Sequence, residues 1–295
     1  MNTTAASDFD AFLASAWNEH GDVPEAVAQR LAAHRGRVTA PAQVGPFAAL
    51  LAHVYGEHLG RWARGVELLD ALRGAAGDDA AARAAIDRRV ASLRHCAGEA
   101  GALEGLTEPD RVSALALAAA ALAGRGDLAG AIGAFDEALA CAQALPTADV
   151  AGIARALAVG GNNLASVLEE KGHRSADETR GMLAAARAGL SYWKLAGTWL
   201  EEERAEYRLA RSLLKAGDVA QAVQAAQRCV AVCEANDAPA LERFFGHAVL
   251  AVAYRSAGDR SGFEASRGLA MQAYDAVPND ERPWCEGDLA ELNTR

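Results

Sequence analysis

The sequence predicts an all-α protein built as an α-solenoid, a stack of antiparallel helix hairpins. The first observation is composition: 51% of the 295 residues are hydrophobic but only 6% are aromatic, and alanine, the strongest helix former, dominates the hydrophobic set. The second is a Gly-Asp phrase that recurs along the chain, and the third is a Leu-Ala pair that precedes it. A unit that repeats in this way cannot bury its apolar face alone, so neighbouring units must stack.

The repeated phrase is GDVPEAV at 21–27, GDLAGAI at 126–132 and GDVAQAV at 217–223. A Leu-Ala pair or a close relative begins eight residues before each glycine, and a bulky residue follows three positions after the second residue of the pair. One further copy carries an extra residue before Gly60. The pairs are Leu13-Ala14, Leu51-Ala52, Ala118-Ala119, Leu164-Ala165, Leu209-Ala210 and Leu250-Ala251.

Each phrase is expected to join two helices. Glycine adopts the left-handed conformation that ends many helices without a steric cost. The following aspartate accepts hydrogen bonds from the free N–H groups of the second helix, and its charge suits the positive end of that helix. We therefore expect Gly21, Gly126 and Gly217 to end one helix each and the next aspartate to cap the following helix. Small residues such as Ala222 then let the two helices lie close together.

The repeats divide the chain into four segments. Residues 1–75 hold degenerate helical repeats, and residues 76–108 hold one helix inside a Gly-rich boundary. Residues 109–278 carry the clearest repeats, and residues 279–295 supply a short capping helix with a polar outer face. Two loops are also predicted, at 39–46 and around 173–181.

Residues 115–139 resemble a tetratricopeptide repeat, because a small-residue pair, Gly-Asp and an Ala, Phe, Ala series follow one another at that family's spacing. Residues 206–230 match the same pattern, and residues 162–173 resemble the longer repeats of the kinesin light chain type. The resemblance implies a right-handed superhelix in which the first helix of each hairpin lines the concave surface. It also implies a protein that binds other proteins there.

Charge and terminal sequence exclude several classes of function. The formal net charge is −10, which argues against a broad nucleic-acid surface because phosphate binding needs a basic field. The N-terminus lacks the basic and apolar regions of a signal peptide, and no apolar run is long enough to span a membrane. Five cysteines, an odd number without a framework spacing, suit a reducing compartment. We therefore expect a cytoplasmic protein with no nucleic-acid or membrane partner.

No motif for a cofactor is present. The sequence contains no phosphate-binding loop, and Gly160-Gly161 lies in a predicted helix, where it lets a neighbouring helix approach closely. Cys229 and Cys233 share one helix face and are able to offer two thiolates, but no further ligand completes a metal set. We expect these cysteines to be structural and the protein to need no cofactor.

Two histidines, His53 and His58, lie close together in sequence and are candidate metal ligands. On an α-helix a spacing of five residues separates the two rings by about 140° around the axis. This angle argues against one shared ion, so no metal site is expected. No nucleophile, base and orienting group stand together in the local sequence either, so we expect a protein that is not an enzyme.

A row of basic residues marks the best candidate for a binding surface. Its basic members are Arg204, Arg208, Arg211 and Lys215, and Tyr207 stands among them on the same helix face. Like charges at these spacings weaken an isolated helix by roughly 0.2–0.5 kcal/mol per pair. Two explanations stay open: salt bridges with nearby glutamates or with acids of adjacent helices, and an anion-binding groove in which guanidinium groups grip a carboxylate. Phe244 and Phe245 are expected either to pack in the core or to form a hydrophobic pocket beside the row.

The resemblance adds two further candidate residues. Some tetratricopeptide proteins clamp a terminal carboxylate with three consecutive repeats; Asn163 stands where the middle repeat of the clamp has an asparagine, and Arg204 and Arg208 stand where the last repeat has basic residues. Ala116 and Ala120 replace the polar residues of the first repeat, so an acidic or polar peptide is implied rather than a clamped terminus. Asn162 is placed to bond a peptide backbone.

Together these features predict a non-enzymatic scaffold that binds a peptide or protein segment in its groove. The alternative is a regulatory or sensor domain that takes a small molecule or a signalling peptide. The repeat pattern also allows a second copy of the chain to bind through the end repeats.

Overall fold

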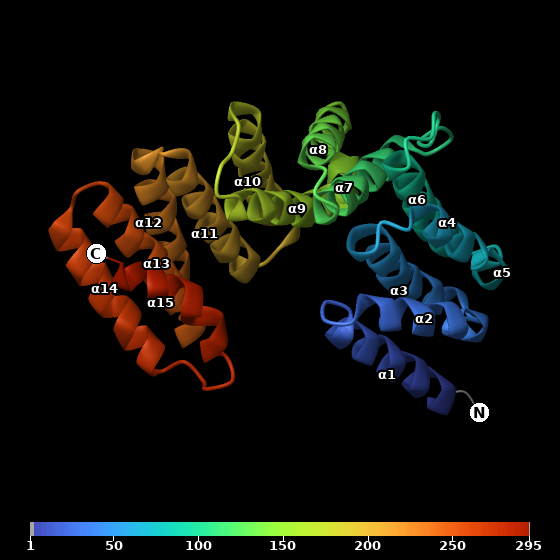
Figure 1. Ribbon diagram of the computed structural model, residues 1–295, viewed down its shortest axis with the longest axis horizontal. Helices are drawn as coiled ribbons and strands as arrows, with labels where there is room; N and C mark the ends of the chain where they lie inside the picture. The colour runs from blue at the N-terminus through green and yellow to red at the C-terminus, as the bar shows by residue number, and fades with distance from the viewer. Residues whose placement is uncertain (1–2, 295) are drawn as a thin grey trace. The chain divides into compact units, whose positions relative to one another are not determined.

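The computed structural model describes residues 3–294, and these residues form helices and connecting turns without a strand (Figure 1). The predicted all-α class is confirmed, and consecutive helices pack in adjacent pairs, as a helical repeat requires. The chain divides into two compact units, residues 1–156 and 157–295. The division falls inside α9 (Thr147–Glu170). The four segments drawn from the sequence stay a prediction, because a division by packing does not delimit groups of repeats.

The first unit has a core formed mainly where α3, α4 and α6 pack together, with Phe47, Leu50 and Leu68 fully buried. A short π-helical segment, η2, continues α3 and packs against α7. The helices before α9 are α1 (Thr3–Glu19), α2 (Pro24–His34), α3 (Pro41–Ala52), η2 (His53–His58), α4 (Trp62–Asp70), α5 (Arg73–Ala76), α6 (Ala80–Cys96), α7 (Glu108–Gly124) and α8 (Leu128–Gln143), with a single 3₁₀ turn, η1 (Arg35–Arg37).

The loop predicted at 39–46 is wrong, because α3 begins at Pro41. Proline suits the first position of a helix, where its missing N–H would have no partner. The side chain of Gln43 accepts hydrogen bonds from the backbone N–H groups of Thr39 and Ala40, 3.0 and 3.2 Å away, and so closes the helix start. Pro46 sits in the second turn and removes one backbone hydrogen bond, but burial of the adjacent Phe47 holds this turn in the core.

The Gly-Asp phrases join helices as predicted in two of the three copies. Gly126 has a φ of 79° and Gly217 a φ of 78°, both in the left-handed region. Asp127 accepts from the N–H of Gly130 at 2.9 Å and caps α8. Asp218 accepts from the N–H of Gln221 at 3.2 Å and caps α12.

The first copy, at Gly21 and Asp22, does not work in this way. Helix α2 has Val23 as its N-cap residue, and no side chain caps it. Pro24 occupies the first turn of the helix. Because proline already has a helical φ and no N–H, this helix starts without an aspartate cap. The prediction for this copy is therefore wrong.

The copy that begins with Leu164-Ala165 and reaches its glycine at Gly172 departs as well. Helix α9 ends at Glu170, and Arg174 donates to the carbonyl oxygens of Leu168, Glu169 and Lys171 at 2.9, 3.1 and 2.5 Å. Its guanidinium thereby satisfies the carbonyl groups that a left-handed glycine otherwise serves. The long loop predicted after this glycine is short, because α10 begins at Ala176 behind a capping box of Ser175 and Glu178.

In the second unit, α13 packs against α11, α12, α14 and α15. Small buried residues lie on α12, as predicted for its close packing against α11: Ala222, Ala226 and Cys229 have no exposed surface. The predicted C-terminal segment contains a short helix, α15, and its role as a cap stays a prediction. The helices after α9 are α10 (Ala176–Ala196), α11 (Trp199–Ala216), α12 (Val219–Ala235), α13 (Ala240–Ser256), α14 (Arg260–Asp275), the 3₁₀ segment η3 (Arg282–Cys285) and α15 (Glu286–Asn293). Within residues 3–294, no helix combines the length and the apolar character needed to cross a lipid bilayer.

Asp127→Ala and Asp22→Ala form a matched pair for the capping mechanism. Loss of the Asp127 cap is expected to lower the free energy of unfolding by about 1 kcal/mol, because the N–H of Gly130 loses its acceptor. Asp22→Ala is expected to change it by less than about 0.5 kcal/mol, since no cap bond is lost. Urea denaturation of the full chain measures both values, and equal losses in the two variants would contradict the assignment.

Candidate functional site

A pocket of about 390 Å³ lies in the second unit. Its size falls within the range of clefts that bind small ligands. Helices α9, α11 and α13, each the first helix of its hairpin, and η3 provide the wall. The lining residues are Asn162, Glu203, Arg204, Tyr207, Arg208, Leu241, Glu242, Phe245 and Trp284.

The pocket residues come from single faces of their helices. On α11 they stand at 203–204 and 207–208, and on α13 at 241–242 and 245. A helix brings residues three and four apart onto the same face, so each helix presents one stripe to the pocket. The start of α11 is set by a capping box in which Thr198 donates its backbone N–H to Glu201 at 2.8 Å.

Arg204 is paired with a buried carboxylate. Its Nη2 lies 2.5 Å from Oε1 of Glu242, and its Nε lies 3.3 Å from Oε2 of the same group. The side chain of Arg204 is 56% exposed, whereas that of Glu242 is 6% exposed. The hydrogen bond to Glu242 raises the pKa of the Arg204 guanidinium. Glu242 therefore orients this guanidinium from its buried side and leaves part of the guanidinium open to a ligand.

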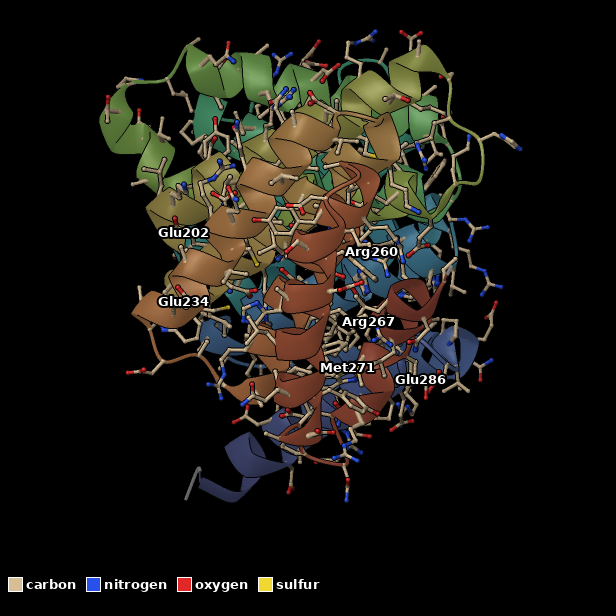
Figure 2. The ribbon with its side chains drawn as sticks, turned by 90° about the vertical axis from the view of Figure 1, so that its left-hand side faces the viewer. Glu202, Glu234, Arg260, Arg267, Met271 and Glu286 are labelled. Atoms are coloured by element: carbon tan, nitrogen blue, oxygen red, sulfur yellow. The ribbon has the colours of Figure 1, made fainter. Side chains whose placement is uncertain are left out.

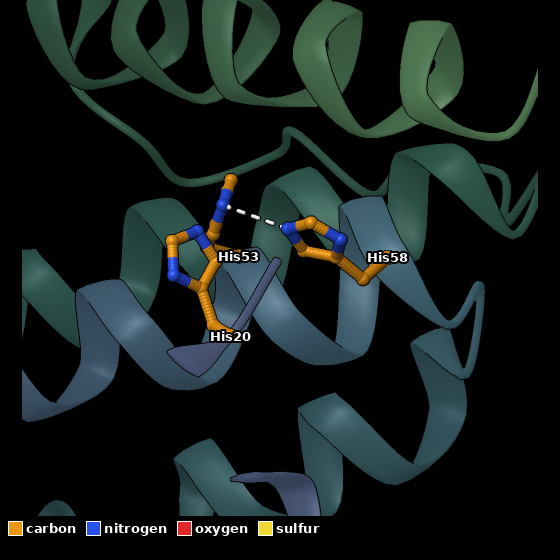
Figure 3. A group of neighbouring side chains, drawn as sticks. All are labelled: His20, His53 and His58. Carbon is orange, nitrogen blue, oxygen red and sulfur yellow. Dashed lines mark hydrogen bonds between the residues drawn. The ribbon is translucent and has the colours of Figure 1, made fainter. Parts of the chain in front are cut away.

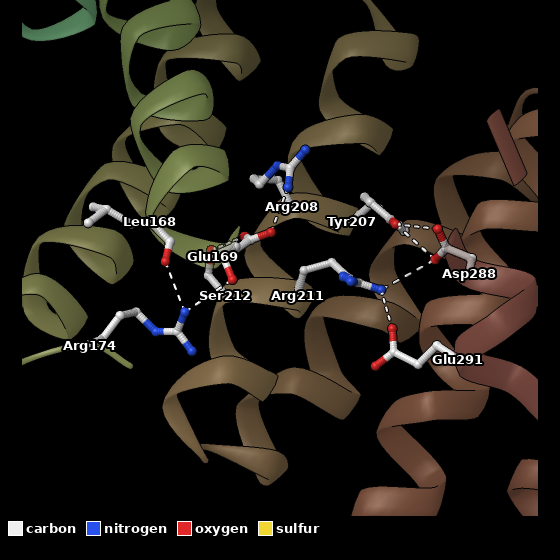
Figure 4. A network of polar contacts seen from close by, with 9 residues as sticks. All are labelled: Leu168, Glu169, Arg174, Tyr207, Arg208, Arg211, Ser212, Asp288 and Glu291. Carbon is white, nitrogen blue, oxygen red and sulfur yellow. Dashed lines mark hydrogen bonds and ion pairs between the residues drawn. The ribbon is translucent and has the colours of Figure 1, made fainter. Parts of the chain in front are cut away.

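Arg208 is held by a second buried carboxylate, that of Glu169 near the end of α9 (Figure 4). Its Nη1 lies 2.6 Å from Oε2 of Glu169, and the Ser212 hydroxyl donates to Oε1 at 2.5 Å. Burial raises the pKa of Glu169, and the charge of Arg208 opposes this rise. These contacts join α9 to α11 across the pocket wall.

A third set of contacts joins α11 to the C-terminal helix. The Tyr207 hydroxyl donates to Oδ1 of Asp288 at 2.9 Å, and Nη1 of Arg211 lies 2.6 Å from Oε2 of Glu291 and 3.4 Å from Oδ1 of Asp288 (Figure 4). Burial and the neighbouring Asp288 raise the pKa of Tyr207. The capping helix α15 is thus held by polar contacts in addition to its apolar ones.

The structure brings together part of the set of residues predicted from the sequence. Asn162, Arg204, Tyr207 and Arg208 line the pocket. The other three, Asn163, Arg211 and Lys215, lie outside this lining: Asn163 and Lys215 are exposed, and the guanidinium of Arg211 is directed toward α15.

Of the two explanations for the basic row, salt bridges with adjacent helices are present for all three arginines. Their partners come from α9, α13 and α15 rather than from the glutamates at the start of α11. Ligand binding by the row stays a prediction. Of the three arginines, Arg204 alone keeps more than half of its side chain exposed.

Glu203 lines the pocket without having been predicted as a site residue. This residue is fully buried, Cys229 donates to its Oε1 at 3.0 Å, and its Oε2 has no hydrogen-bond partner among residues 3–294. Burial raises the pKa of Glu203 to about 9, and the neighbouring Cys233 and Glu242 add to the rise. A neutral carboxyl at pH 7 is able to donate a hydrogen bond, which an ionised one is not.

The signal for Glu203 was present but weak. Glu203 stands one helical turn before Tyr207 and two turns before the fully buried Ala210. This spacing assigns Glu203 to the inner face of α11. The run Glu201–Glu203 instead resembles a solvated charged patch. Of the two phenylalanines, Phe244 is buried in the core and Phe245 lines the pocket, so each alternative holds for one of them.

His53 and His58 of the first unit are arranged differently from the 140° separation expected on an α-helix. His53 and His58 do not point apart: their Nε2 atoms are 3.1 Å from each other (Figure 3). The cause is the π-helical backbone of η2, where the N–H of Leu59 bonds to the carbonyl of Val54 at 3.1 Å. A π-helix has roughly 4.4 residues per turn, so two side chains five residues apart are separated by only about 50° around its axis. Burial and the neighbouring His53 lower the pKa of His58.

No protein-family model matches the chain, and the comparison with curated proteins finds no match. The tetratricopeptide resemblance therefore rests on the repeat pattern itself.

Arg208→Ala tests whether the contact with Glu169 organises this unit. Its removal leaves a buried carboxylate without its cation, so the free energy of unfolding is expected to fall by about 3 kcal/mol. Arg260→Ala is the matched control, because Arg260 pairs with Glu264 on α14 and its side chain is 89% exposed (Figure 2). This control is expected to lose less than about 1 kcal/mol in the same denaturation measurement. A loss no larger than that of the control would contradict the assignment.

Glu203→Gln tests the buried neutral carboxyl. Between the ordinary pKa of 4.5 and the folded value of about 9, folded Glu203 keeps a proton that the unfolded chain has released. The wild-type free energy of unfolding therefore falls as pH rises through this window. Glutamine cannot ionise, so the variant is expected to gain at least about 1 kcal/mol relative to wild type between pH 5 and pH 8. The exposed substitution Glu170→Gln serves as the control, and parallel pH profiles of wild type and Glu203→Gln would show that Glu203 is ionised.

Proposed function

We propose that this protein is a non-enzymatic scaffold of the tetratricopeptide type, and that its C-terminal pocket binds a peptide or a segment of another protein. The observation that supports this most is the origin of the pocket wall: the first helices of successive hairpins contribute Asn162, Arg204 and Phe245 side by side. In the proposed right-handed superhelix, these helices line the inner surface. The protein would act in the cytoplasm, and its end repeats offer a second surface for self-association.

The lining combines apolar and polar groups. Leu241, Phe245 and Trp284 supply apolar surface, and Trp284 is 64% exposed although it is a large aromatic residue. Exposed tryptophan beside a pocket is typical of residues that dominate binding energy. Asn162 is half-buried and carries both a donor and an acceptor for a peptide backbone.

The charges of the pocket favour an acidic segment. Arg204 and Arg208 bring two positive charges to the lining, and Glu242 brings one negative charge. Glu203 is neutral at pH 7 because burial raises its pKa to about 9. Arg208 is itself paired with Glu169, so Arg204 carries the charge that an acidic partner is able to reach: more than half of its side chain is exposed, and a carboxylate of the partner is able to share its exposed edge.

A second candidate function is a regulatory or sensor domain that takes a small molecule. The pocket volume of about 390 Å³ suits a compact ligand. The protonated carboxyl of Glu203 offers a buried donor that such a ligand is able to use. Small-molecule binding would use the same pocket residues as peptide binding, and the ligand would be shorter than a peptide.

Selection of peptides from a random display library on the full chain tests the proposal. Enriched peptides are expected to carry an aromatic or aliphatic residue next to an acidic one. Trp284→Ala and Arg204→Ala are expected to weaken their binding at least tenfold, about 1.4 kcal/mol, as measured by fluorescence anisotropy.

Leu195→Ala is the matched control, because Leu195 lies on α10 and is 66% exposed outside the pocket lining. It is expected to bind the selected peptides as wild type does. Peptides that bind all three variants equally, or a library without enrichment, would contradict peptide binding. A small molecule that raises the melting temperature of wild type but not of Trp284→Ala would favour the sensor function instead.

A further inference from the structure

Three histidines meet at one point in the first unit, which contains no residue of the pocket. His20 follows the end of α1, and His53 and His58 begin and end η2. Each histidine offers one ring nitrogen, and these three nitrogens all lie within 4.8 Å of one another. The ring centroids are 4.8 Å apart for His20 and His53, 5.1 Å for His20 and His58, and 4.7 Å for His53 and His58 (Figure 3).

The distance between the nitrogens matches a shared ion. A tetrahedral zinc ion binds histidine nitrogen at about 2.0–2.1 Å, so two ligand nitrogens lie about 3.3–3.4 Å apart. The Nε2 atoms of His53 and His58 are 3.1 Å apart. Without a metal, a proton on one of these nitrogens bridges the pair; an ion in that place requires His58 to carry its proton on Nδ1 instead.

Two of the rings are oriented from behind by oxygen atoms. Nδ1 of His53 lies 2.8 Å from Oε2 of Glu57, and Nδ1 of His20 contacts the carbonyl oxygen of Trp17. Each oxygen holds a proton on Nδ1 and leaves the lone pair on Nε2. A carboxylate or carbonyl behind the ring is the arrangement that fixes metal-binding histidines and raises their basicity.

The surroundings leave a path for an ion and for one more ligand. All three histidines are half-buried, so solvent reaches the cluster. The indole of Trp17 covers one side, with its centroid 5.0 Å from His20 and 5.4 Å from His53. The guanidinium of Arg125 is engaged with the carbonyl oxygen of His58 at 2.7 Å, and Glu57 brings the compensating negative charge beside His53.

We propose that His20, His53 and His58 form a Zn²⁺ site with three imidazole ligands. Imidazole suits zinc among the first-row divalent ions, and three histidines with a fourth position for water make a complete tetrahedral set. Glu57 is a positioning residue that acts through His53. The ion would tie the end of α1 to η2. This site is independent of the proposed peptide pocket, whose residues all belong to the other unit.

Zinc titration of the chelator-treated full-length protein tests the proposal, with a chromophoric chelator as competitor. One Zn²⁺ per chain is expected. His53→Ala and His58→Ala are expected to weaken binding more than 100-fold, and Glu57→Gln by about 10- to 100-fold. The control is His173→Ala, because His173 is exposed in the loop after α9; it is expected to bind as wild type does.

Two measurements on the wild-type chain do not depend on how the variants fold. Bound Co²⁺ is expected to show the strong visible absorption of a tetrahedral site without a thiolate charge-transfer band. Imidazole NMR signals of His20, His53 and His58 are expected to shift with zinc, while those of the four other histidines in the sequence stay. The proposal is overturned by a thiolate band, by the absence of stoichiometric binding, by an affinity that survives His53→Ala/His58→Ala, or by NMR shifts at other histidines. A Glu57→Gln affinity equal to wild type would remove the positioning role.

Discussion

The second unit depends on the way α11 neutralises buried carboxylates on its neighbours. Its arginines reach one acidic group on α9, one on α13 and two on α15. A buried carboxylate without a cation is costly, whereas a paired one adds little net stability over an apolar contact. These pairs therefore act mainly on specificity: they define which helices lie beside α11 and at which register. The pairs are Arg204–Glu242, Arg208–Glu169, Arg211–Asp288 and Arg211–Glu291.

The same contacts shape the pocket. Arg204 and Arg208 stand on its wall because each is anchored at its inner edge by a carboxylate, so neither side chain collapses onto the apolar residues. A guanidinium that is already oriented loses less side-chain entropy when a ligand binds. Glu203 contributes in a different way, since its burial keeps a neutral polar group at a site where a charge would repel Glu242.

In the first unit, close backbone packing controls the histidine cluster. A Cβ added at Gly124 of α7 would lie 2.8 Å from the carbonyl oxygen of Glu57, so only glycine lets α7 approach η2 this closely. The π-helical turn in η2 then rotates His58 toward His53. A π-helical turn of this kind is rare and is found frequently at functional sites.

The sequence by itself determined the helical class, the hairpin joints at Gly126 and Gly217 and the identity of the basic row, because these follow from local propensity and from spacing along one helix. It identified four of the nine pocket residues for the same reason. Tertiary structure alone decided which carboxylates meet the arginines, that Glu203 is buried, and that His53 and His58 converge. Each of these depends on contacts between segments far apart in the chain, or on a backbone that departs from 3.6 residues per turn, and neither is encoded in a local pattern.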